Sequence, residues 1–308
     1  MRDQVALRLP RIRSVYRSVY RSLSGRRLHS AIGKAIVYLL ALAFGLLFLA
    51  PFLFALSTSL KDPSEIYLFP PKWLPSQLLW QNYVEAWSLA PFTRFLTNTI
   101  VVTGFAMFGQ LVSGCLVAYG FARFRFPGRD QLFIVLLATM IIPVEVTIIP
   151  SFLLFKYLNW LDTWLPLIVP AYFGGSAFYI FLMRQFLLTL PREMDEAAEI
   201  DGAGSLRILW QILLPLMRPA IATAAIFSFV RHWNAFFLPL VYLSKQRLFT
   251  LSLGLRYFQN LESQAIGGPP AEHYLMAVAI VTTIPMVILF FSLQQYFIRG
   301  IVMSGIKG

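Results

Sequence analysis

Long apolar runs separated by short polar connections make up most of this sequence. A helix needs roughly 20 apolar residues to cross a bilayer, and six runs are long enough, near residues 35–59, 95–121, 131–153, 164–186, 219–242 and 273–297. With no convincing internal repeat, the pattern predicts an all-α polytopic membrane protein with six transmembrane helices. One membrane domain would cover residues 35–308, after a polar arm at residues 1–34.

The 187–218 loop interrupts this apolar pattern with the only long carboxylate-rich segment after residue 130. Pro191 suits the first turn of a helix, where a missing N–H costs nothing. Glu193 and Asp195 would then place negative charge at the positive end of the helix dipole. We expect this helix to end at Asp201-Gly202, because glycine tolerates the left-handed conformation that closes a helix.

A second short helix is expected to follow in the same loop. Ser205 can cap a helix over Leu206–Leu214, and Pro215 would end or kink it. Two short helices at an angle, outside the lipid, form a docking surface for another protein rather than a catalytic pocket.

Charged residues are few but strongly basic in balance. The 308 residues are 58% hydrophobic and 13% charged, with a net charge of +12, whereas soluble domains carry about twice that charged share. Nucleic acid is the weaker explanation of the positive charge, because no soluble domain interleaves basic residues with aromatics. A single cysteine, Cys115, and three scattered histidines exclude a disulfide framework and a zinc cluster.

The basic residues also predict the orientation in the membrane. The 1–34 arm holds nine basic residues and one acid, Asp3. Further basic residues lie at 122–130, in the 187–218 loop and at the carboxyl end, so both termini and that loop are predicted to be cytoplasmic. The arm itself is either an amphipathic helix on an anionic leaflet or an unstructured basic tail.

The 187–218 loop resembles the EAA loop of permease subunits in binding-protein-dependent ABC importers. The residues that carry this resemblance, with the spacing of the family, are Glu196, Ala197, Ala198, Asp201, Gly202, Ala203, Ile212, Leu214 and Pro215. In that family the loop forms a coupling helix that seats in a groove of the ATPase subunit. The resemblance therefore assigns these residues to coupling with an ATPase.

Further motifs are similar to those of the MalG-type carbohydrate permeases within this family. They cover nearly the whole chain after residue 34 and are Asn82-Tyr83, Asn98, Tyr119-Gly120-Phe121-Ala122-Arg123, Ile142-Pro143, Ile149-Pro150, Trp233-Asn234-Ala235-Phe236, Pro239-Leu240, Gln295-Tyr296-Phe297 and Gly300.

The resemblance implies a subunit of a carbohydrate ABC importer in the bacterial inner membrane. Its expected partners are a homologous MalF-type permease, a dimer of ABC ATPase chains, an extracytoplasmic solute-binding protein and membrane lipid. ATP binding would close the ATPase dimer, and the coupling loops would pass that motion to the spans. A midplane site would then open alternately to the two sides for a mono- or oligosaccharide.

The chain is not expected to be an enzyme or to bind a cofactor. It contains no Gly-x-x-x-x-Gly-Lys-Ser/Thr loop, so it cannot cradle ATP phosphates itself. No nucleophile is paired with a base, and no carboxylate pair marks a soluble cleft. ATP and magnesium would be held by the partner ATPase.

Two charged residues, Glu145 and Arg231, fall deep within predicted spans, where a charge is a functional candidate by default. Counting 1.5 Å per residue places Glu145 roughly 21 Å along the third span and Arg231 roughly 18 Å along the fifth. Matched depth slightly favours a structural ion pair between them. Alternatively, one or both line the pathway with Trp233, Asn234 and Phe236, because sugars stack on aromatic rings and bond to polar groups.

Three other functions compete with this one. The same architecture could import glycerol-3-phosphate or another polar solute, although a phosphate cargo would require more basic residues on the pathway than Arg231 alone. A secondary transporter would need its own coupling-ion site and usually internal repeats, which the sequence does not show. A membrane-embedded enzyme would need a catalytic constellation, and none is present.

Overall fold

A computed structural model describes the backbone of residues 9–264 and 272–305, and the side chains of residues 33–260 and 272–292. The described residues form helices and no strands, as the apolar periodicity predicts. In chain order they are α1 (Leu9–Ser59), α2 (Pro63–Ile66), α3 (Gln81–Leu89), α4 (Phe92–Arg123), α5 (Arg129–Ala138), η1 (Thr139–Ile141), α6 (Val144–Tyr157), α7 (Leu165–Ile168), η2 (Val169–Tyr172), α8 (Ala177–Thr189), α9 (Glu193–Ile200), α10 (Ser205–Ile208), η3 (Leu209–Leu213), α11 (Leu214–Leu216), α12 (Arg218–Trp233), α13 (Phe237–Tyr242), η4 (Gln246–Leu248), α14 (Leu251–Gln264) and α15 (Glu272–Gly305).

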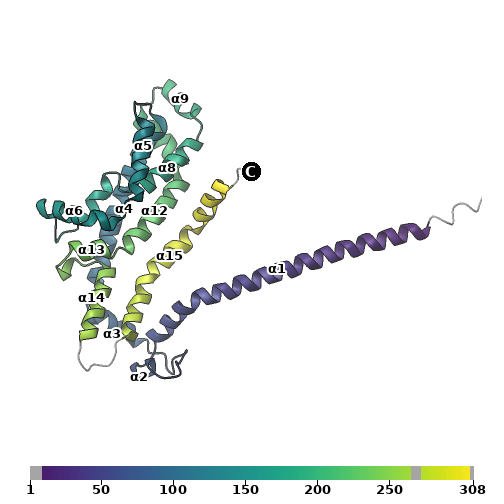
Figure 1. The fold of residues 1–308 in the computed structure, drawn as a ribbon, viewed down its shortest axis with the longest axis horizontal. Helices are drawn as coiled ribbons and strands as arrows, with labels where there is room; N and C mark the ends of the chain where they lie inside the picture. The colour runs from purple at the N-terminus through teal and green to yellow at the C-terminus, as the bar shows by residue number, and fades with distance from the viewer. Residues whose placement is uncertain (1–8, 265–271, 306–308) are drawn as a thin grey trace, which may run out of the picture.

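Helix α4 forms the centre of the fold (Figure 1). It packs against α8 and α12 and, near its start, against α14. In its most apolar window 44% of the residues are buried, compared with 11% in α15 and none in α1. The second predicted span is therefore the inner helix of this chain.

Two hydrophobic clusters lie at opposite ends of α4. One contains Ala118 and Tyr119 of α4 with Met183 and Leu187 of α8, and it extends into the 187–218 loop. The other contains Phe92 and Phe95 of α4 with residues of α3, α14 and α15. A single straight helix thus connects the 187–218 loop to the far end of the molecule.

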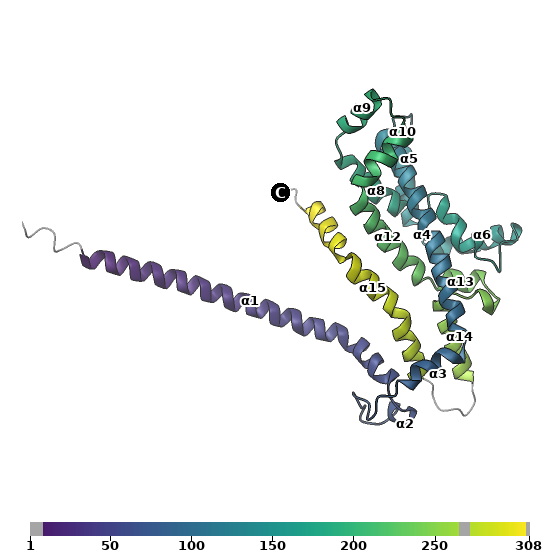
Figure 2. The same cartoon turned by 180° about the vertical axis from the view of Figure 1, so that it is seen from behind.

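Helix α1 stands apart from the other helices over most of its length, as both ribbon views show (Figures 1 and 2). It meets α15 near its carboxyl end. Residues Gly33–Ser59 are apolar enough to cross a membrane, yet none of that window is buried within this chain. A surface this apolar needs lipid or another protein around it.

The helices that could span a membrane match four of the six predicted runs as single segments, and the other two only as bent helix pairs. Four described segments are long and apolar enough to span: Gly33–Ser59, Phe92–Arg123, Leu165–Thr189 and Glu272–Ser292. Two more arise if each of two bent helix pairs counts as one span, Arg129–Ile141 with Val144–Tyr157 and Ser205–Leu216 with Arg218–Trp233.

The third predicted run, 131–153, is not one straight helix. Helix α5 and the 3-10 turn η1 end before Pro143, and α6 leaves at an angle of 98° to the first segment. Ile142 is extended, with φ −75° and ψ 115°, because the residue before a proline is driven away from the helical region. The Ile142-Pro143 motif therefore marks a break.

The fourth and fifth runs are broken as well. Gly174 and Gly175, with φ +84° and +54°, separate η2 from α8. Helix α12 ends at Trp233, and residues 234–236 lead into the short helix α13. Within a membrane, such non-helical backbone is tolerated only where protein buries it or where it lines a water-filled cavity.

Candidate functional site

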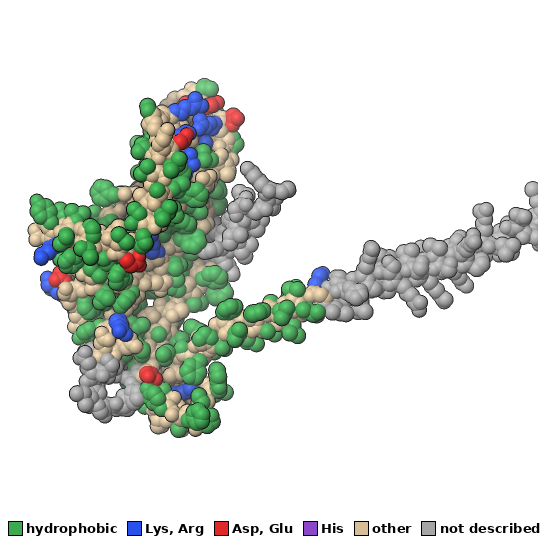
Figure 3. All heavy atoms as spheres, in the orientation of Figure 1, with side chains coloured by type: hydrophobic (Ala, Val, Ile, Leu, Met, Phe, Trp, Pro, Cys, Tyr) green, Lys and Arg blue, Asp and Glu red, His purple; other side chains and the backbone are tan. Residues whose placement is uncertain are grey.

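The first helix of the 187–218 loop is α9. Its first turn contains Glu193, Asp195 and Glu196, so the carboxylates lie at the positive end of the helix dipole as predicted. The helix begins at Glu193, two residues after Pro191, so Pro191 precedes the first turn instead of lying in it. Basic and acidic side chains gather at this end of the molecule (Figure 3).

Gly202 closes α9 as the sequence predicts. Its φ is +79°. The Gly202 N–H donates to the Glu199 carbonyl at 3.0 Å, and the Ala203 N–H donates to the Ala198 carbonyl at 2.9 Å. This pair of bonds is the Schellman motif, which satisfies the last carbonyls of a helix and turns the chain sharply.

The second helix differs from the prediction at both ends. Gly204 is the N-cap residue of α10 and Ser205 is already helical, with no side-chain cap bond. The helix continues through the π-helical turn η3 into α11 and ends at Leu216, one residue after Pro215. Pro215 has no N–H for the Gln211 carbonyl, so a wider π turn before it is the physically expected response.

Polar contacts hold the 187–218 loop to the end of α4. Arg123 Nε lies 2.6 Å from Asp195 Oδ2, and the two side chains are only 6% and 14% exposed. Arg123 Nη2 also donates to the Leu190 carbonyl at 3.1 Å. The Tyr119 hydroxyl donates to the Ser205 carbonyl at 3.1 Å. Both helices of the loop are thus tied to the last turn and a half of α4.

The sequence analysis missed this role of Asp195, Arg123 and Tyr119. From the sequence, Asp195 was assigned only to the helix dipole. The Tyr119–Arg123 motif marked the family resemblance, and Arg123 also counted toward the predicted cytoplasmic side. The available signal was the combination of a carboxylate in the loop with an arginine at the end of a span. Burial raises the pKa of the Asp195 carboxyl, even though the Arg123 guanidinium acts to lower that pKa.

The residues assigned to coupling divide by exposure. Glu196, Ala197, Asp201, Gly202 and Pro215 are exposed, whereas Ala198 is buried. Ala203, Ile212 and Leu214 are half-buried against the hydrophobic cluster that α4 and α8 share with this loop. The motif therefore combines outward-facing positions with positions that pack the loop onto the spans.

Large apolar side chains on the same loop point outward. Ile200, Leu206 and Trp210 are 86%, 65% and 53% exposed. They lie at the end of α9, in α10 and in η3, among exposed charged residues. An apolar group rimmed by charges is typical of a protein-binding surface, and the sequence analysis did not single out these three residues.

The proposed pathway residues are not gathered into one site within this chain. Trp233 is 5% exposed and packs in the core, where it stacks on Phe229 with ring centroids 5.1 Å apart. Asn234 donates to the Val230 carbonyl at 2.9 Å. Asn234 and Phe236 are exposed at the break after α12. Trp233 is thus a packing residue in this structure.

The favoured ion pair between Glu145 and Arg231 is not formed within this chain, so that prediction is wrong. Within the described side chains, the ion pairs shorter than 4.0 Å are Lys72–Glu65, Arg123–Asp195, Arg129–Asp130 and Lys245–Asp162. Glu145 lies exposed in the first turn of α6 and Arg231 lies exposed beside the Tyr179 hydroxyl. The depth estimate failed because it assumed a straight third span, whereas that span bends by 98° before Glu145.

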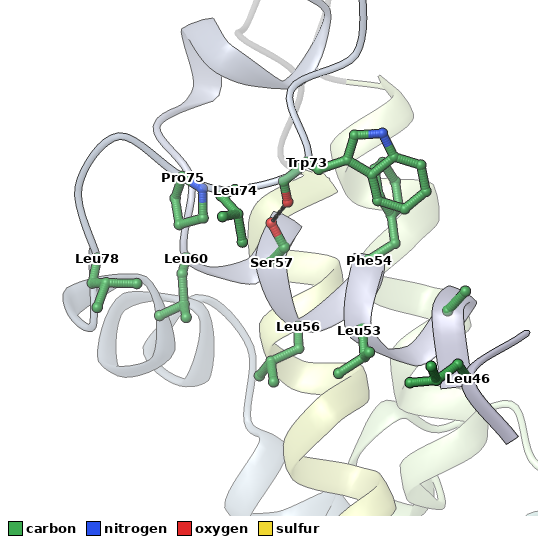
Figure 4. A pocket seen from close by; sticks show the side chains of 11 residues that line it. Leu46, Leu53, Phe54, Leu56, Ser57, Leu60, Trp73, Leu74, Pro75 and Leu78 are labelled. Atoms are coloured by element: carbon green, nitrogen blue, oxygen red, sulfur yellow. Dashed lines mark hydrogen bonds between the residues drawn. The ribbon is translucent and has the colours of Figure 1, made fainter. Parts of the chain in front are cut away.

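A hollow of about 450 Å³ lies at the carboxyl end of α1 (Figure 4), at the opposite end of the molecule from the 187–218 loop (Figure 1). Its lining is apolar apart from Ser57, whose hydroxyl already donates to the Trp73 carbonyl. A polar solute would lose its hydrogen bonds with water there without replacement. This hollow is therefore not a site for a sugar.

Comparison with known proteins identifies the family. The sequence profile described as "Binding-protein-dependent transport system inner membrane component" matches residues 110–303. The chain belongs to this family. The matched range contains the 187–218 loop and all three broken spans. The family consists of membrane transport components and not of enzymes.

Individual relatives of this transport component cover most of its length. The sn-glycerol-3-phosphate transport system permease protein UgpE of Yersinia pestis bv. Antiqua (strain Antiqua) is 34% identical over 265 residues, 84% of this chain and 92% of the relative. The melibiose/raffinose/stachyose import permease protein MelC of Bacillus subtilis (strain 168) is 32% identical over 279 residues, 89% of this chain and 96% of the relative.

A solved structure has the same fold as this family member. It is a chain of a bacterial ABC transporter involved in the import of the acidic polysaccharide alginate, with a TM-score of 0.76 and 25% sequence identity. The match covers 86% of this chain and 96% of that chain. The helical arrangement around α4 is thus shared with an ABC transporter.

The Schellman turn generates a matched prediction. Gly202→Ser should destabilise the loop, because a Cβ in the left-handed region costs about 1–2 kcal/mol. Gly204→Ser should be neutral or stabilising, because φ is −71° there, a Cβ meets nothing within 4 Å and serine is a good N-cap. Hydrogen exchange of residues 193–208 measures both. Equal protection in the two variants would contradict the assigned turn.

The buried ion pair generates a second prediction. Arg123→Gln should lower the free energy of unfolding by about 1–3 kcal/mol, because it leaves the Asp195 carboxylate buried without its cation. Asp195→Asn should cost less, since burial already disfavours the charged form of this carboxyl and Arg123 still donates to the Leu190 carbonyl. The double variant should be less affected than the sum of the two. Additive losses would show that the two side chains do not interact.

Proposed function

We propose that this chain is a permease subunit of a carbohydrate ABC importer and forms half of the translocation pathway. The observation that carries the proposal is the 187–218 loop, which displays an apolar group at its tip and is tied by buried polar contacts to the central helix α4. Family membership supplies the transport system. Relatives named for melibiose, arabinooligosaccharides and diacetylchitobiose support a sugar cargo.

The proposed topology has six spans, with each broken run counted once. The 187–218 loop and both termini lie in the cytoplasm, since basic residues concentrate at the amino terminus, at 122–130 and in that loop. The 61–94 loop lies outside, and its tryptophans suit the membrane interface. The basic arm at 1–34 is proposed to be cytoplasmic, and from Leu9 it continues into the first span as the single helix α1. The membrane domain covers 35–308.

The proposed energy source is a separate ATPase dimer that docks on the 187–218 loop. Ile200, Leu206 and Trp210 would enter an apolar groove of the ATPase, with Glu196 and Asp201 at the rim. Nucleotide and magnesium would be held by that ATPase, because this chain has no phosphate-binding loop. An extracytoplasmic solute-binding protein would deliver the cargo to the opposite end.

The proposed coupling path runs through the Arg123–Asp195 pair and the Tyr119–Ser205 hydrogen bond. Movement of α9 and α10 would be passed to α4, because a buried ion pair and a packed hydrophobic cluster resist separation. Helix α4 packs on α8 and α12. These are the helices that flank two of the three breaks, so a shift of the loop would alter the spacing of the broken spans.

A homologous second permease is the proposed neighbour of α1 and α6. Helix α1 has no buried residue in its apolar window, and α6 is exposed along nearly all of its length. The exposed Glu145 on α6 would be costly against lipid, so it needs polar surroundings from the partner or from the pathway. We therefore assign Glu145 and Arg231 to the pathway, together with Asn234 and Phe236 at the break after α12.

A phosphorylated cargo is the second candidate. The relative named for sn-glycerol-3-phosphate is 34% identical to this chain, and Arg231 offers one exposed cation near a break. A phosphate group usually engages several basic donors, and within the described pathway residues Arg231 is the only one. Uptake of labelled disaccharide against labelled glycerol-3-phosphate by the reconstituted importer distinguishes the two.

The docking role is tested by charge placement on the loop. Leu206→Glu should abolish co-purification of the ATPase with the permease pair, because a carboxylate would be buried in the docking groove. Leu89→Glu is the matched control: Leu89 is 51% exposed on α3, at the opposite end of the molecule. If Leu206→Glu retains the ATPase at wild-type stoichiometry, the loop is not the docking surface and the proposed function loses its main support.

The pathway assignment yields a separate test. Glu145→Gln and Arg231→Gln should each leave the yield of folded complex unchanged, because each charge is exposed within this chain and unpaired with the other. Each should reduce solute uptake at least tenfold, and the double variant should be no better than the worse single one. Recovery of uptake in the double variant would instead indicate that the two charges pair in the assembled transporter.

A further inference from the structure

A polar hollow lies beside the junction of α4 and α5, away from the docking group on the 187–218 loop. Its volume is about 260 Å³, and it is lined by Arg125, Phe126, Gly128, Arg129, Asp130 and Gln131. The tight loop that forms it follows the last residue of the central span, Arg123. The hollow therefore lies where a span leaves the membrane.

Positive charge exceeds negative charge around this hollow. Arg129 Nε pairs with Asp130 Oδ1 at 2.9 Å, and Arg184 of α8 lies close enough for its charge to interact with both. Arg125 is exposed and belongs to none of the ion pairs of the described side chains. Two arginines and one aspartate therefore line the hollow, and the charge of Arg125 is left for an anion.

Apolar surface continues directly from the hollow. Phe124 and Phe126 on the loop are 44% and 38% exposed, and Leu132, Ile134 and Val135 of α5 are 53%, 66% and 62% exposed. A soluble anion would gain nothing from this apolar face. An amphiphile would place its charged group against the arginines and its chain along α5.

We propose that this hollow binds the phosphate headgroup of an anionic phospholipid, with Arg125 as the principal contact and the acyl chains along the exposed face of α5. Basic residues at the cytoplasmic end of a span are the common means of recognising such lipids. The inference goes beyond transport itself and rests on the proposed function only for the choice of leaflet. A lipid held here would brace the loop that begins one residue after Arg123, the residue that anchors the 187–218 loop.

The test uses the assembled transporter in detergent, titrated with phosphatidylglycerol, phosphatidylcholine or inorganic phosphate and followed by native mass spectrometry. We expect phosphatidylglycerol to bind more tightly than phosphatidylcholine. Arg125→Gln should weaken phosphatidylglycerol binding about fivefold, the equivalent of about 1 kcal/mol for one basic side chain at an anionic surface. Arg125→Lys should retain most of it. Arg256→Gln, which removes an exposed arginine from α14, should bind as the wild type does.

Three results would overturn the proposal. The first is phosphatidylglycerol binding that is unaffected by Arg125→Gln. The second is Arg125-dependent binding of inorganic phosphate as tight as that of the lipid, which would make the hollow a site for soluble anions. The third is a loss of the ATPase in Arg125→Gln with lipid binding intact, which would make the ATPase the occupant. ATPase retention in the wild type, recorded from the same spectra, reports on the proposed function separately.

Discussion

The contact between Arg123 and Asp195 is the interaction on which the rest of the structure depends. It joins the last residue of the central helix to the first turn of α9, and both side chains are nearly excluded from water. The hydrogen bond from Tyr119 to the Ser205 carbonyl adds a second tie to α10. The first helices of the 187–218 loop are thus held to the end of α4 by an ion pair and a hydrogen bond. The proposed coupling to an ATPase would require such an attachment.

The ion pair is also costly to bury, which explains its surroundings. Burial raises the pKa of Asp195 despite the neighbouring guanidinium, so the pair contributes less to stability than its 2.6 Å contact suggests. Ala198, Ala203 and Leu187 pack on the same hydrophobic cluster and provide the non-polar part of the attachment. Packing supplies the stability, and the charges set which part of the loop meets the end of α4.

The breaks in three spans are the second feature that organises the molecule. Pro143, the Gly174-Gly175 pair and residues 234–236 each interrupt a run that hydropathy alone treats as continuous. Glu145 and Arg231 lie within a few residues of two of these breaks and are exposed in the isolated chain. A broken helix presents backbone groups and charges that lipid cannot satisfy. These positions are consistent with the aqueous pathway proposed above.

The sequence by itself determined the helical class, the approximate positions of the apolar runs and the turn at Gly202, because these follow from local hydropathy and backbone preference. It also identified the 187–218 loop, whose residue types and spacing are unusual for a membrane protein. Tertiary structure alone decided that Asp195 meets Arg123, that Trp233 is buried, and that Glu145 and Arg231 do not meet. Each of these depends on which faces two helices turn toward each other and on how far a proline bends the chain. Those quantities are set by packing between distant segments, so no local pattern contains them.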